Sequence, residues 1–539
     1  MSDSGISRRE MVRRGGLLAL PALLKGRVTA AEPFGAAPAP APPSALTGLR
    51  IGPEIYQSIG VRPFVNARGT YTILTGSTLL PEPRAAMDAA SRHYVHLDEL
   101  AEAVGRRLAE LTKAEWGMVT TGCAAALTHA TAACVTGGNP DLHVRVPDLR
   151  GFPRDECVIP AYSRNVYDAA VRAVGVKVVE VATAGELEAA FGPRTALVYV
   201  LAGPDADQGP LGTKALCAAA KKRGVPVLVD AAAEILTIPN VHLGLGADLV
   251  AYSGGKCLRG PQAAGLLLGR KDLVKAAWVG SAPHHGFARG FKVGKEEAMA
   301  MLAAVEAWTK RDYETEIRLW ASWLDTIAKR LAPIAGVTTS VTPAEGLSNR
   351  MPLLQIRWDE TRLGTTGAAV ARLLFESEPR ISLFPAEGKL GPGETGLTIG
   401  PYMMAAGDEK VIAERLFAVL SSPPRVAAKA KAAPAADLTG SWDVRIQYAA
   451  GVSVHRLHVR QRGNDLDGVH QGDFESRDLE GSIDGDAVRI SSAWAHGDEI
   501  HYTFTGTVSG DEMAGELSLG EYLGARFSAK RHAPRGPQA

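Results

Sequence analysis

One lysine of this chain stands where a side chain could do covalent chemistry. Lys256 follows the apolar run 249–252 and the turn 253–255, which has only small side chains, and a second apolar run at 263–268 comes after it. A lysine held between two buried strands loses hydration, which favours its neutral amine, and a neutral amine can form a Schiff base with an aldehyde. The pattern therefore predicts a reactive amine at Lys256. The alternative is an ordinary turn lysine.

An aspartate stands in a matching place upstream. Asp230 ends the apolar run 227–229. An acidic group there can keep the ring nitrogen of pyridoxal 5'-phosphate (PLP) protonated, so that the ring accepts electrons from a substrate carbanion. The alternative is that Asp230 only caps the next helix. Since the two residues follow two predicted strands in order, we interpret Lys256 and Asp230 as the catalytic pair of a PLP site.

A third strand end offers a place for the phosphate. An apolar strand predicted at 116–120 leads into a glycine turn and a small-residue helix at 125–135. Free backbone N–H groups at a helix start, on the positive end of its dipole, bind phosphate well. Any α/β turn can use glycine, so the motif alone is weak. Ser253 could add a hydroxyl. The expected cradle comprises Thr121, Gly122, Cys123, Ala124 and Ser253.

The elements that must position these residues alternate between strand and helix. Predicted strands at 157–161, 177–181, 195–201 and 225–230 are separated by helical stretches. This alternation indicates an α/β fold with a parallel sheet covered on both faces. Ligands of such sheets lie beyond the carboxyl ends of the strands, which is where the predicted site residues fall.

Four motifs together resemble a known family. They are V-N-A-R-G-T (65–70), T-T-G-C-A-A-A (120–126), V-L-V-D (227–230) and S-G-G-K-C-L-R-G-P-Q-A-A-G (253–265). Their order resembles fold-type-I PLP-dependent enzymes, which have an aminotransferase-like fold. The nearest group is that of selenocysteine synthase (L-seryl-tRNA(Sec) selenium transferase), which also contains D-glucosaminate-6-phosphate ammonia-lyase. The resemblance runs from about 49 to 421.

The resemblance implies a domain layout and roles for the site residues. It implies a large PLP-binding domain with an N-terminal arm at 49–312, a small α+β domain at 313–422, and a homodimer or a higher multiple of it. Lys256 would be the Schiff-base lysine and Asp230 the partner of the ring nitrogen. The phosphate cradle would be the one given above.

The resemblance also suggests residues for the substrate. The basic segment 289–295 is similar to one that holds anions in this family, which favours Arg289 and Lys292 as substrate-binding residues. The alternative is a solvated, charged loop. Arg164 is similar to a family arginine near the cofactor. Arg380 is a candidate for binding a carboxylate.

The ring-stacking residue stays open. Many relatives place a histidine near the ring, and this chain has none there. Tyr162 or Tyr167 could take its place, although either could equally be a core tyrosine.

For the reaction, the resemblance favours α,β-elimination from an amino acid or amino-sugar acid by an ammonia-lyase. Transamination, racemisation and aldol cleavage would use the same two anchors, Lys256 and Asp230. Selenium transfer is a further alternative. It is disfavoured because the transferase has an N-terminal tRNA-binding region, whereas the corresponding part of this chain resembles an export signal and a linker. A non-catalytic scaffold on a PLP fold is the alternative of a different class.

Both ends of the chain differ from the family. Residues 1–31 contain Arg8-Arg9, a short apolar core and small residues, which resembles a twin-arginine signal peptide and predicts a periplasmic protein without a membrane span. Residues 32–48 form a Pro/Ala linker and 423–437 an Ala/Lys/Pro linker. Residues 438–535 alternate polar and apolar side chains, which predicts a separate all-β barrel or sandwich.

Composition sets outer limits on function. The 539 residues carry a net charge of +1, which argues against a nucleic-acid footprint. The five cysteines show no C-x-x-C pair, so neither a disulfide framework nor a cysteine metal site is expected. Histidines of the C-terminal domain are scattered, and we expect them on the surface rather than around a metal. They are His455, His458, His470, His496 and His501.

Overall fold

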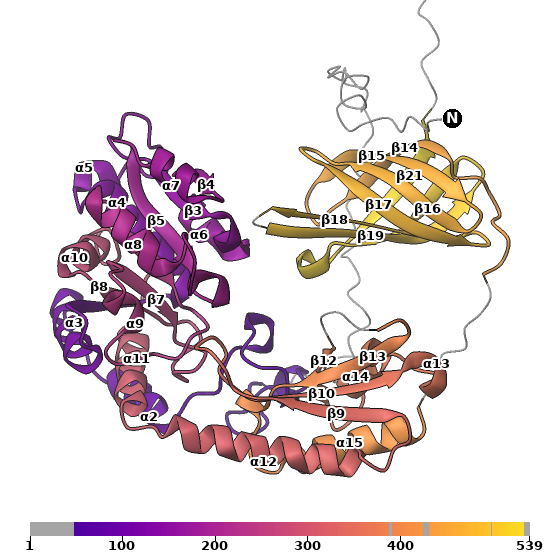
Figure 1. The fold of residues 1–539 in the computed structure, drawn as a ribbon, viewed down its shortest axis with the longest axis horizontal. Helices are drawn as coiled ribbons and strands as arrows, with labels where there is room; N and C mark the ends of the chain where they lie inside the picture. Colours follow the sequence, from indigo (N-terminus) through magenta and orange to yellow (C-terminus); the bar gives the residue numbers. More distant parts are fainter. Residues whose placement is uncertain (1–47, 387–390, 424–430, 497, 533–539) are drawn as a thin grey trace, which may run out of the picture.

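The computed structural model describes residues 48–386, 391–423, 431–496 and 498–532. The predicted signal peptide (1–31) and all but the last residue of the first linker (32–48) lie outside the described residues, as do residues 424–430 of the second linker (423–437). Figure 1 shows three bodies: a large α/β domain, a small α+β domain and a β-barrel. The predicted fold class is confirmed, and the all-β domain is a barrel rather than a sandwich.

The large domain is built on a seven-stranded sheet in the order β2-β8-β7-β6-β5-β3-β4. Only β8 runs antiparallel to its neighbours. The central strands are buried along almost their whole length and mostly apolar, because helices cover both faces. The strands are β2 (Trp116–Thr120), β3 (Glu156–Pro160), β4 (Lys177–Val181), β5 (Thr195–Leu201), β6 (Val227–Asp230), β7 (Leu249–Ser253) and β8 (Gly265–Gly269).

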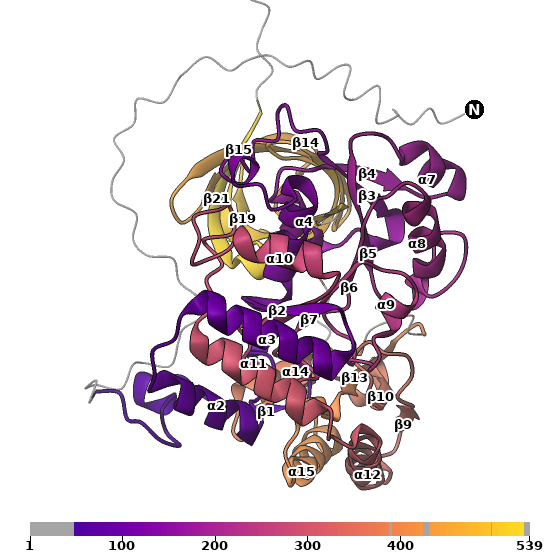
Figure 2. The ribbon, with the colours of Figure 1, turned by 90° about the vertical axis from the view of Figure 1, so that its left-hand side faces the viewer.

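Two apolar clusters lie on opposite faces of this sheet. One packs against α3 (Leu97–Thr112), α8 (Thr213–Lys222) and α11 (Lys295–Trp308). The other packs against α4 (Gly122–Thr136) and α10 (Lys271–Val279). Figure 2 shows α3 and α11 side by side on one side of the sheet. The remaining helices of the domain are α2 (Pro81–Ser91), α5 (Pro140–His143), α6 (Ala169–Arg172), α7 (Ala184–Ala190) and α9 (Val241–Gly244).

The long helix α12 (Tyr313–Leu331) leads into the small domain. Its sheet has the order β12-β13-β10-β9 and packs on α14 (Gly367–Glu376) and α15 (Asp408–Ser421). A separate parallel pair joins β1 (Val65–Asn66) to β11 (Ile381–Ser382). The N-terminal arm is thereby fixed to the small domain. The other elements are β9 (Val337–Thr342), β10 (Leu353–Asp359), α13 (Glu360–Leu363), β12 (Phe384–Pro385) and β13 (Glu394–Ile399).

The C-terminal domain is a closed antiparallel barrel, β14 to β21, in sequence order. Side chains alternate between an apolar interior and a polar exterior, as the sequence pattern predicts. The β18–β19 hairpin reaches toward the large domain, where β19 lies beside the short helix η4 (Val166–Asp168). The strands are β14 (Gly440–Gln447), β15 (Val452–Arg462), β16 (Asp465–Gln471), β17 (Ser476–Asp484), β18 (Ala487–His496), β19 (Asp498–Ser509), β20 (Glu512–Ser518) and β21 (Gly524–Arg531).

Among the described residues, no helix is both long enough and apolar enough to cross a bilayer.

Candidate active site

The carboxyl ends of β6 and β7 bring Asp230 and Lys256 to one cavity. The two strands are parallel neighbours, with Asp230 paired to Ala251. β7 ends at Ser253, and the tight turn after it is held by a hydrogen bond from Gly254 N–H to the Ala264 carbonyl (2.8 Å). The cavity measures about 830 Å³ and lies between the large domain, the N-terminal arm and the small domain. Asp230, Ser253 and Lys256 all line it.

The Asp230 carboxylate is buried, with 2% of the residue exposed. Tyr199 Oη donates to its Oδ2 (3.1 Å), and the Ala232 N–H (3.0 Å) and the Cys123 thiol (3.5 Å) donate to its Oδ1. No cation of the described chain lies within ion-pair distance. Burial raises the pKa of Asp230, although these hydrogen bonds and the nearby charge of Lys256 oppose the shift. A buried carboxylate of this kind is stabilised by a cation brought in by a ligand.

The start of α4 forms the other wall of the cavity. Gly122, Cys123 and Ala124 line it, and their N–H groups belong to the first turn of a 15-residue helix. The helix start packs so closely on β8 that a Cβ at Gly265 would lie 2.5 Å from Gly122 C and 2.7 Å from Cys123 N. Glycine at 265 therefore allows the helix start to reach the cavity. An anion can approach these N–H groups because the side chains around them are small.

The N-terminal arm adds a guanidinium that sequence reasoning missed. Asn66 Oδ1 accepts hydrogen bonds from the backbone N–H of Arg68 and of Gly69 (3.0 Å each), a turn that sets the direction of Arg68. Arg68 lines the cavity, and its Cζ lies 4.1 Å from the ring centroid of Phe384. Its Nε is buried without a hydrogen-bond partner, and the described residues give its guanidinium no ion pair. Arg68 belongs to the V-N-A-R-G-T motif, but the motif gives no sign that its side chain lines the cavity.

Comparison with known proteins identifies the family. The chain is 32% identical over 376 residues to a 5'-C-glycyluridine monooxygenase-decarboxylase of Streptomyces sp, covering 68% of this chain and 92% of that protein. It is 28% identical over 373 residues to D-glucosaminate-6-phosphate ammonia lyase of Salmonella typhimurium, covering 68% and 97%. The aminotransferase class-V family model matches residues 160–284. The chain belongs to the fold-type-I PLP-dependent enzymes.

A solved structure of D-glucosaminate-6-phosphate ammonia-lyase matches this PLP-dependent enzyme with a TM-score of 0.61 and 28% identity. The match covers 69% of this chain and 99% of that one. An L-seryl-tRNA(Sec) selenium transferase of Moorella thermoacetica is 29% identical over 287 residues, covering 47% of this chain and 57% of that protein. The predicted resemblance is confirmed at the level of the family and the cofactor.

The residues of the cavity fit PLP. Lys256 is half-buried and makes no ion pair within the described chain, so its amine is free to hold the aldehyde. Asp230 would face the ring nitrogen, whose positive charge would offset the cost of burying the carboxylate. Gly122, Cys123, Ala124 and Ser253 would hold the phosphate. Thr121 does not line the cavity, because it is turned away and its hydroxyl donates to the Phe291 carbonyl (2.7 Å).

The structure separates the two tyrosine candidates for the ring-stacking residue. Tyr167 lines the cavity from η4. Tyr162 does not line it, and its hydroxyl donates to the Leu211 carbonyl (2.7 Å). Tyr167 is therefore the tyrosine that can reach the ring.

Two arginines proposed for the substrate lie elsewhere. The Arg164 guanidinium pairs with Asp168 (2.6 Å) and Glu180 (2.9 Å) and does not line the cavity of the single described chain, so its place beside the cofactor stays a prediction. Arg380 donates to the carbonyls of Phe375 and Arg62 and does not line the cavity of the single described chain, so it stays an untested candidate. Both guanidinium groups form ion pairs or hydrogen bonds with neighbouring residues of the chain.

The basic segment lies near the cradle but not in the cavity. Arg289 and Lys292 are exposed and do not line the cavity within the single described chain. The Thr121–Phe291 hydrogen bond ties their segment to the turn before α4. Their substrate role stays a prediction.

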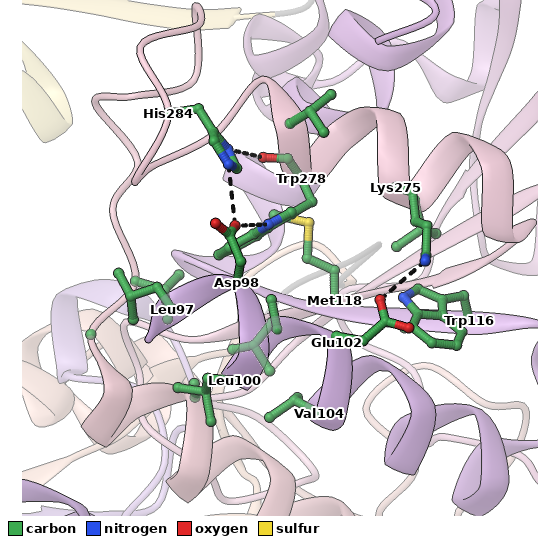
Figure 3. Close-up of a pocket in the computed structure, with 18 residues that line it drawn as sticks. Leu97, Asp98, Leu100, Glu102, Val104, Trp116, Met118, Lys275, Trp278 and His284 are labelled. Atoms are coloured by element: carbon green, nitrogen blue, oxygen red, sulfur yellow. Dashed lines mark hydrogen bonds and ion pairs between the residues drawn. The ribbon is translucent and has the colours of Figure 1, made fainter. Parts of the chain in front are cut away.

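A second cavity, of about 380 Å³, lies between α3, β2 and α10 (Figure 3). Its walls are mostly apolar, and its polar groups pair with one another: Trp278 Nε1 donates to Asp98 Oδ1 (2.8 Å), and Lys275 pairs with Glu102 (3.0 Å). Neither Lys256 nor Asp230 lines it. It is therefore not the PLP site.

Proposed function

We propose that this PLP-dependent enzyme is an ammonia-lyase that acts on an amino acid or amino-sugar acid. The observation that carries the proposal is one cavity that combines Lys256, Asp230 and the unpaired guanidinium of Arg68. Similarity to D-glucosaminate-6-phosphate ammonia lyase over 97% of that protein supports this reaction class. The net reaction converts a 2-amino-3-hydroxy acid into a 2-oxo acid and ammonia, with one water lost and one water regained.

The chain's own residues divide this work. Bound PLP supplies a ring that accepts electrons from the bond broken at the substrate's α-carbon. Lys256, once displaced from the cofactor by the substrate amine, is the base that takes the α-proton. Asp230 holds a proton on the ring nitrogen. Tyr199 and the Ala232 N–H keep its carboxylate oriented.

Arg68 is the proposed anchor for the acid group of the substrate. It is a cation lining the cavity, its guanidinium has no ion pair within the described residues, and its Nε lacks a partner. The Phe384 ring supports the guanidinium from one side. A guanidinium held in this way presents its N–H groups to a carboxylate or phosphate.

Oxidative decarboxylation is the second candidate reaction. The monooxygenase-decarboxylase relative is 32% identical over 376 residues, a higher identity than the 28% of the ammonia lyase. The two reactions differ in what they consume and release. The oxidative reaction consumes O₂ and releases CO₂, whereas elimination followed by hydrolysis gives a 2-oxo acid and ammonia and needs no oxidant. Transamination, racemisation, aldol cleavage and selenium transfer remain further candidates without an observation of their own.

The deciding experiment uses the PLP-loaded protein with a panel of 3-hydroxy amino acids and 2-amino aldonic acids, in air and under nitrogen. Ammonia and a 2-oxo acid in equal amounts under both gases would support the lyase. Product formed only in air, with O₂ uptake and CO₂ release, would contradict it. Lys256→Ala should lose both the visible absorbance of the lysine-bound cofactor and turnover. A wild-type protein that binds no PLP would favour a scaffold.

We further propose that the enzyme is a homodimer or a higher multiple of it. Large apolar side chains of the N-terminal arm are exposed in the single chain, among them Ile51, Tyr94 and Ile73, of which Ile73 is 83% exposed beside the cavity-lining Thr72. A second copy would cover such residues. Light scattering of the purified protein tests this, and a monomer at micromolar concentration would contradict it.

Export to the periplasm by the twin-arginine route is proposed from the sequence of residues 1–31, and no nucleic-acid partner is proposed because the net charge is +1. Cell fractionation with Arg8→Lys and Arg9→Lys tests the export. The doubly substituted protein should stay in the cytoplasm.

A further inference from the structure

The interior of the C-terminal barrel is apolar along most of its length, but polar at one end. Hairpin turns of an antiparallel barrel alternate between its ends, so the turns at 448–451, 472–475 and 519–523 lie together. The interior positions next to these turns are occupied by polar side chains. His455, His470, Arg477 and Ser492 are all buried. The expectation that His455 and His470 lie on the surface is therefore wrong.

These side chains form one hydrogen-bonded chain across neighbouring strands. Ser492 Oγ and His470 Nδ1 are 2.7 Å apart, and His470 Nε2 and His455 Nδ1 are 2.8 Å apart. Asp473 Oδ2 lies 3.3 Å from His455 Nε2. Burial lowers the pKa of His470 to about 3, so it is neutral at physiological pH. The two imidazoles are satisfied by one another and by their neighbours, and they bring no full charge.

Arg477 differs, because its charge is buried with no carboxylate of the described residues in direct contact, although Asp473 lies close enough for the two charges to interact. It faces His470 across the β16–β17 ladder, and only 8% of the residue is exposed. Its Nε and Nη1 are fully buried and have no hydrogen-bond partner in the described chain, where no carboxylate comes within ion-pair distance. The Tyr502 ring lies 4.7 Å from its Cζ. Burying a charged guanidinium in a barrel interior costs desolvation free energy unless an acceptor binds its N–H groups.

The approach to Arg477 is from the turn end of the barrel. A Cβ at Gly472 would lie 3.3 Å from the Glu475 carbonyl oxygen and 3.7 Å from both Arg477 Nη1 and His455 Cε1, so the turn at Gly472 lies directly beside both groups. The turns around this end expose apolar side chains, with Phe474 97% and Leu523 81% exposed. A polar interior with an apolar rim is typical of ligand sites in barrel mouths.

We propose that this end of the barrel binds the carboxylate of a small organic acid, anchored by Arg477. The charge balance favours a singly charged group. Burial opposes ionisation of Asp473, but hydrogen bonds with Ser453 and His455 lower its pKa, so it is ionised beside the site. The Arg477 guanidinium and the ionised Asp473 together carry no net charge, so a singly charged carboxylate adds less uncompensated negative charge than a dianionic phosphate would. The carboxylate could belong to a free sugar acid or to the C-terminus of a peptide.

Calorimetric titration of the full-length, PLP-loaded protein tests the proposal with three probes: gluconate for a free sugar acid, N-acetylalanine for a peptide end, and inorganic phosphate. Saturable binding of either acid is expected, at least tenfold weaker in Arg477→Gln. The matched control is Arg489→Gln, an exposed arginine of β18 in the same barrel, which should bind like the wild type. Because the control retains the catalytic cavity, binding there cancels in the comparison.

Arg477→Lys keeps the charge and should show intermediate affinity. Crystals of the wild type soaked with the acid that binds should show its carboxylate within hydrogen-bond distance of Arg477, which needs no variant to fold. The proposal is overturned if only water is found there, if Arg477→Gln binds as well as Arg489→Gln, or if phosphate binds more tightly than both acids.

Discussion

The hydroxyl of Tyr199 donates a 3.1 Å hydrogen bond to Oδ2 of Asp230, the carboxylate that we propose as the partner of the cofactor ring nitrogen. Both residues are buried, on the adjacent parallel strands β5 and β6. Asn165 Nδ2 in turn donates to the Tyr199 oxygen (3.2 Å). This chain of hydrogen bonds fixes the direction of the carboxylate before any cofactor binds.

Tyr199→Phe should therefore reduce turnover about tenfold to a hundredfold, the effect of losing a hydrogen bond to a charged group. Tyr199 is a positioning residue, so the absorbance spectrum of the bound cofactor and its pH dependence should change as well. The matched control is Tyr252→Phe on β7, a buried tyrosine whose oxygen accepts from Asn240 instead. Equal losses in both variants would speak against the positioning role.

Asp230→Asn should stabilise the PLP-free protein while weakening PLP binding. Burial raises the pKa of Asp230 above its ordinary value of 3.8, so the native state favours the protonated form. The stability from this group is present below pH 3.8 and is lost as the pH rises through the raised pKa. Asparagine does not ionise. Chemical unfolding of both PLP-free proteins should show a difference in unfolding free energy that grows with pH, and a constant difference would refute the explanation.

Arg68→Gln should raise the KM for an acidic substrate about tenfold to a hundredfold and change kcat less, because it removes charge-assisted hydrogen bonds to an acid group that keeps its charge throughout the reaction. Steady-state kinetics on the substrate identified by the panel measure this. Arg318→Gln, an exposed arginine on α12, is the control and should leave KM unchanged. A fall confined to kcat would place Arg68 in another role.

Gly265→Ala should weaken PLP binding at least tenfold and cost about 1–3 kcal/mol of stability, the usual range for overpacking. The added Cβ would lie 2.5 Å from Gly122 C, so the start of α4 must move away from the cavity. Equilibrium dialysis of PLP and denaturant unfolding measure the two effects. Gly192→Ala, where a Cβ meets no atom within 4 Å, should bind PLP like the wild type.

Asp168→Asn should destabilise the protein by about 2–3 kcal/mol at neutral pH, since Asp168 is buried between Arg164 and the partly exposed Arg172. Burial opposes ionisation of Asp168, but hydrogen bonds from both arginines outweigh it and lower its pKa. This contribution is present above the ordinary pKa of 3.8 and is lost as the pH falls through the lower folded value.

Unfolding of wild type and Asp168→Asn at a series of pH values should show the difference shrinking in acid. The control Asp148→Asn removes a pair with the highly exposed Arg150 and should change stability little at any pH. A pH-independent loss in Asp168→Asn would mean that packing, and not the charge, is responsible.

The predictions that succeeded depended on local patterns. The runs 227–229 and 249–252 are apolar because both faces of their sheet are covered, and the last residue of β6, Asp230, and the turn after β7, which holds Lys256, lie at the carboxyl edge. Asp230 and Lys256 could thus be paired from the sequence alone. The period of two in residues 438–535 likewise predicted an all-β domain.

Only the tertiary structure decided which charged side chains face the cavity. Arg68 reaches it because β1 pairs with β11, more than 300 residues later in the chain, and Arg164 is drawn away by Asp168 and Glu180. His455 and His470 meet inside the barrel only when β15 pairs with β16 and the barrel encloses that face of the two strands. The period of apolar residues in the sequence indicates which face of a strand is buried, and each strand of these sheets has such a face. The partner of a long polar side chain depends on contacts between distant segments, and these leave no period in the sequence.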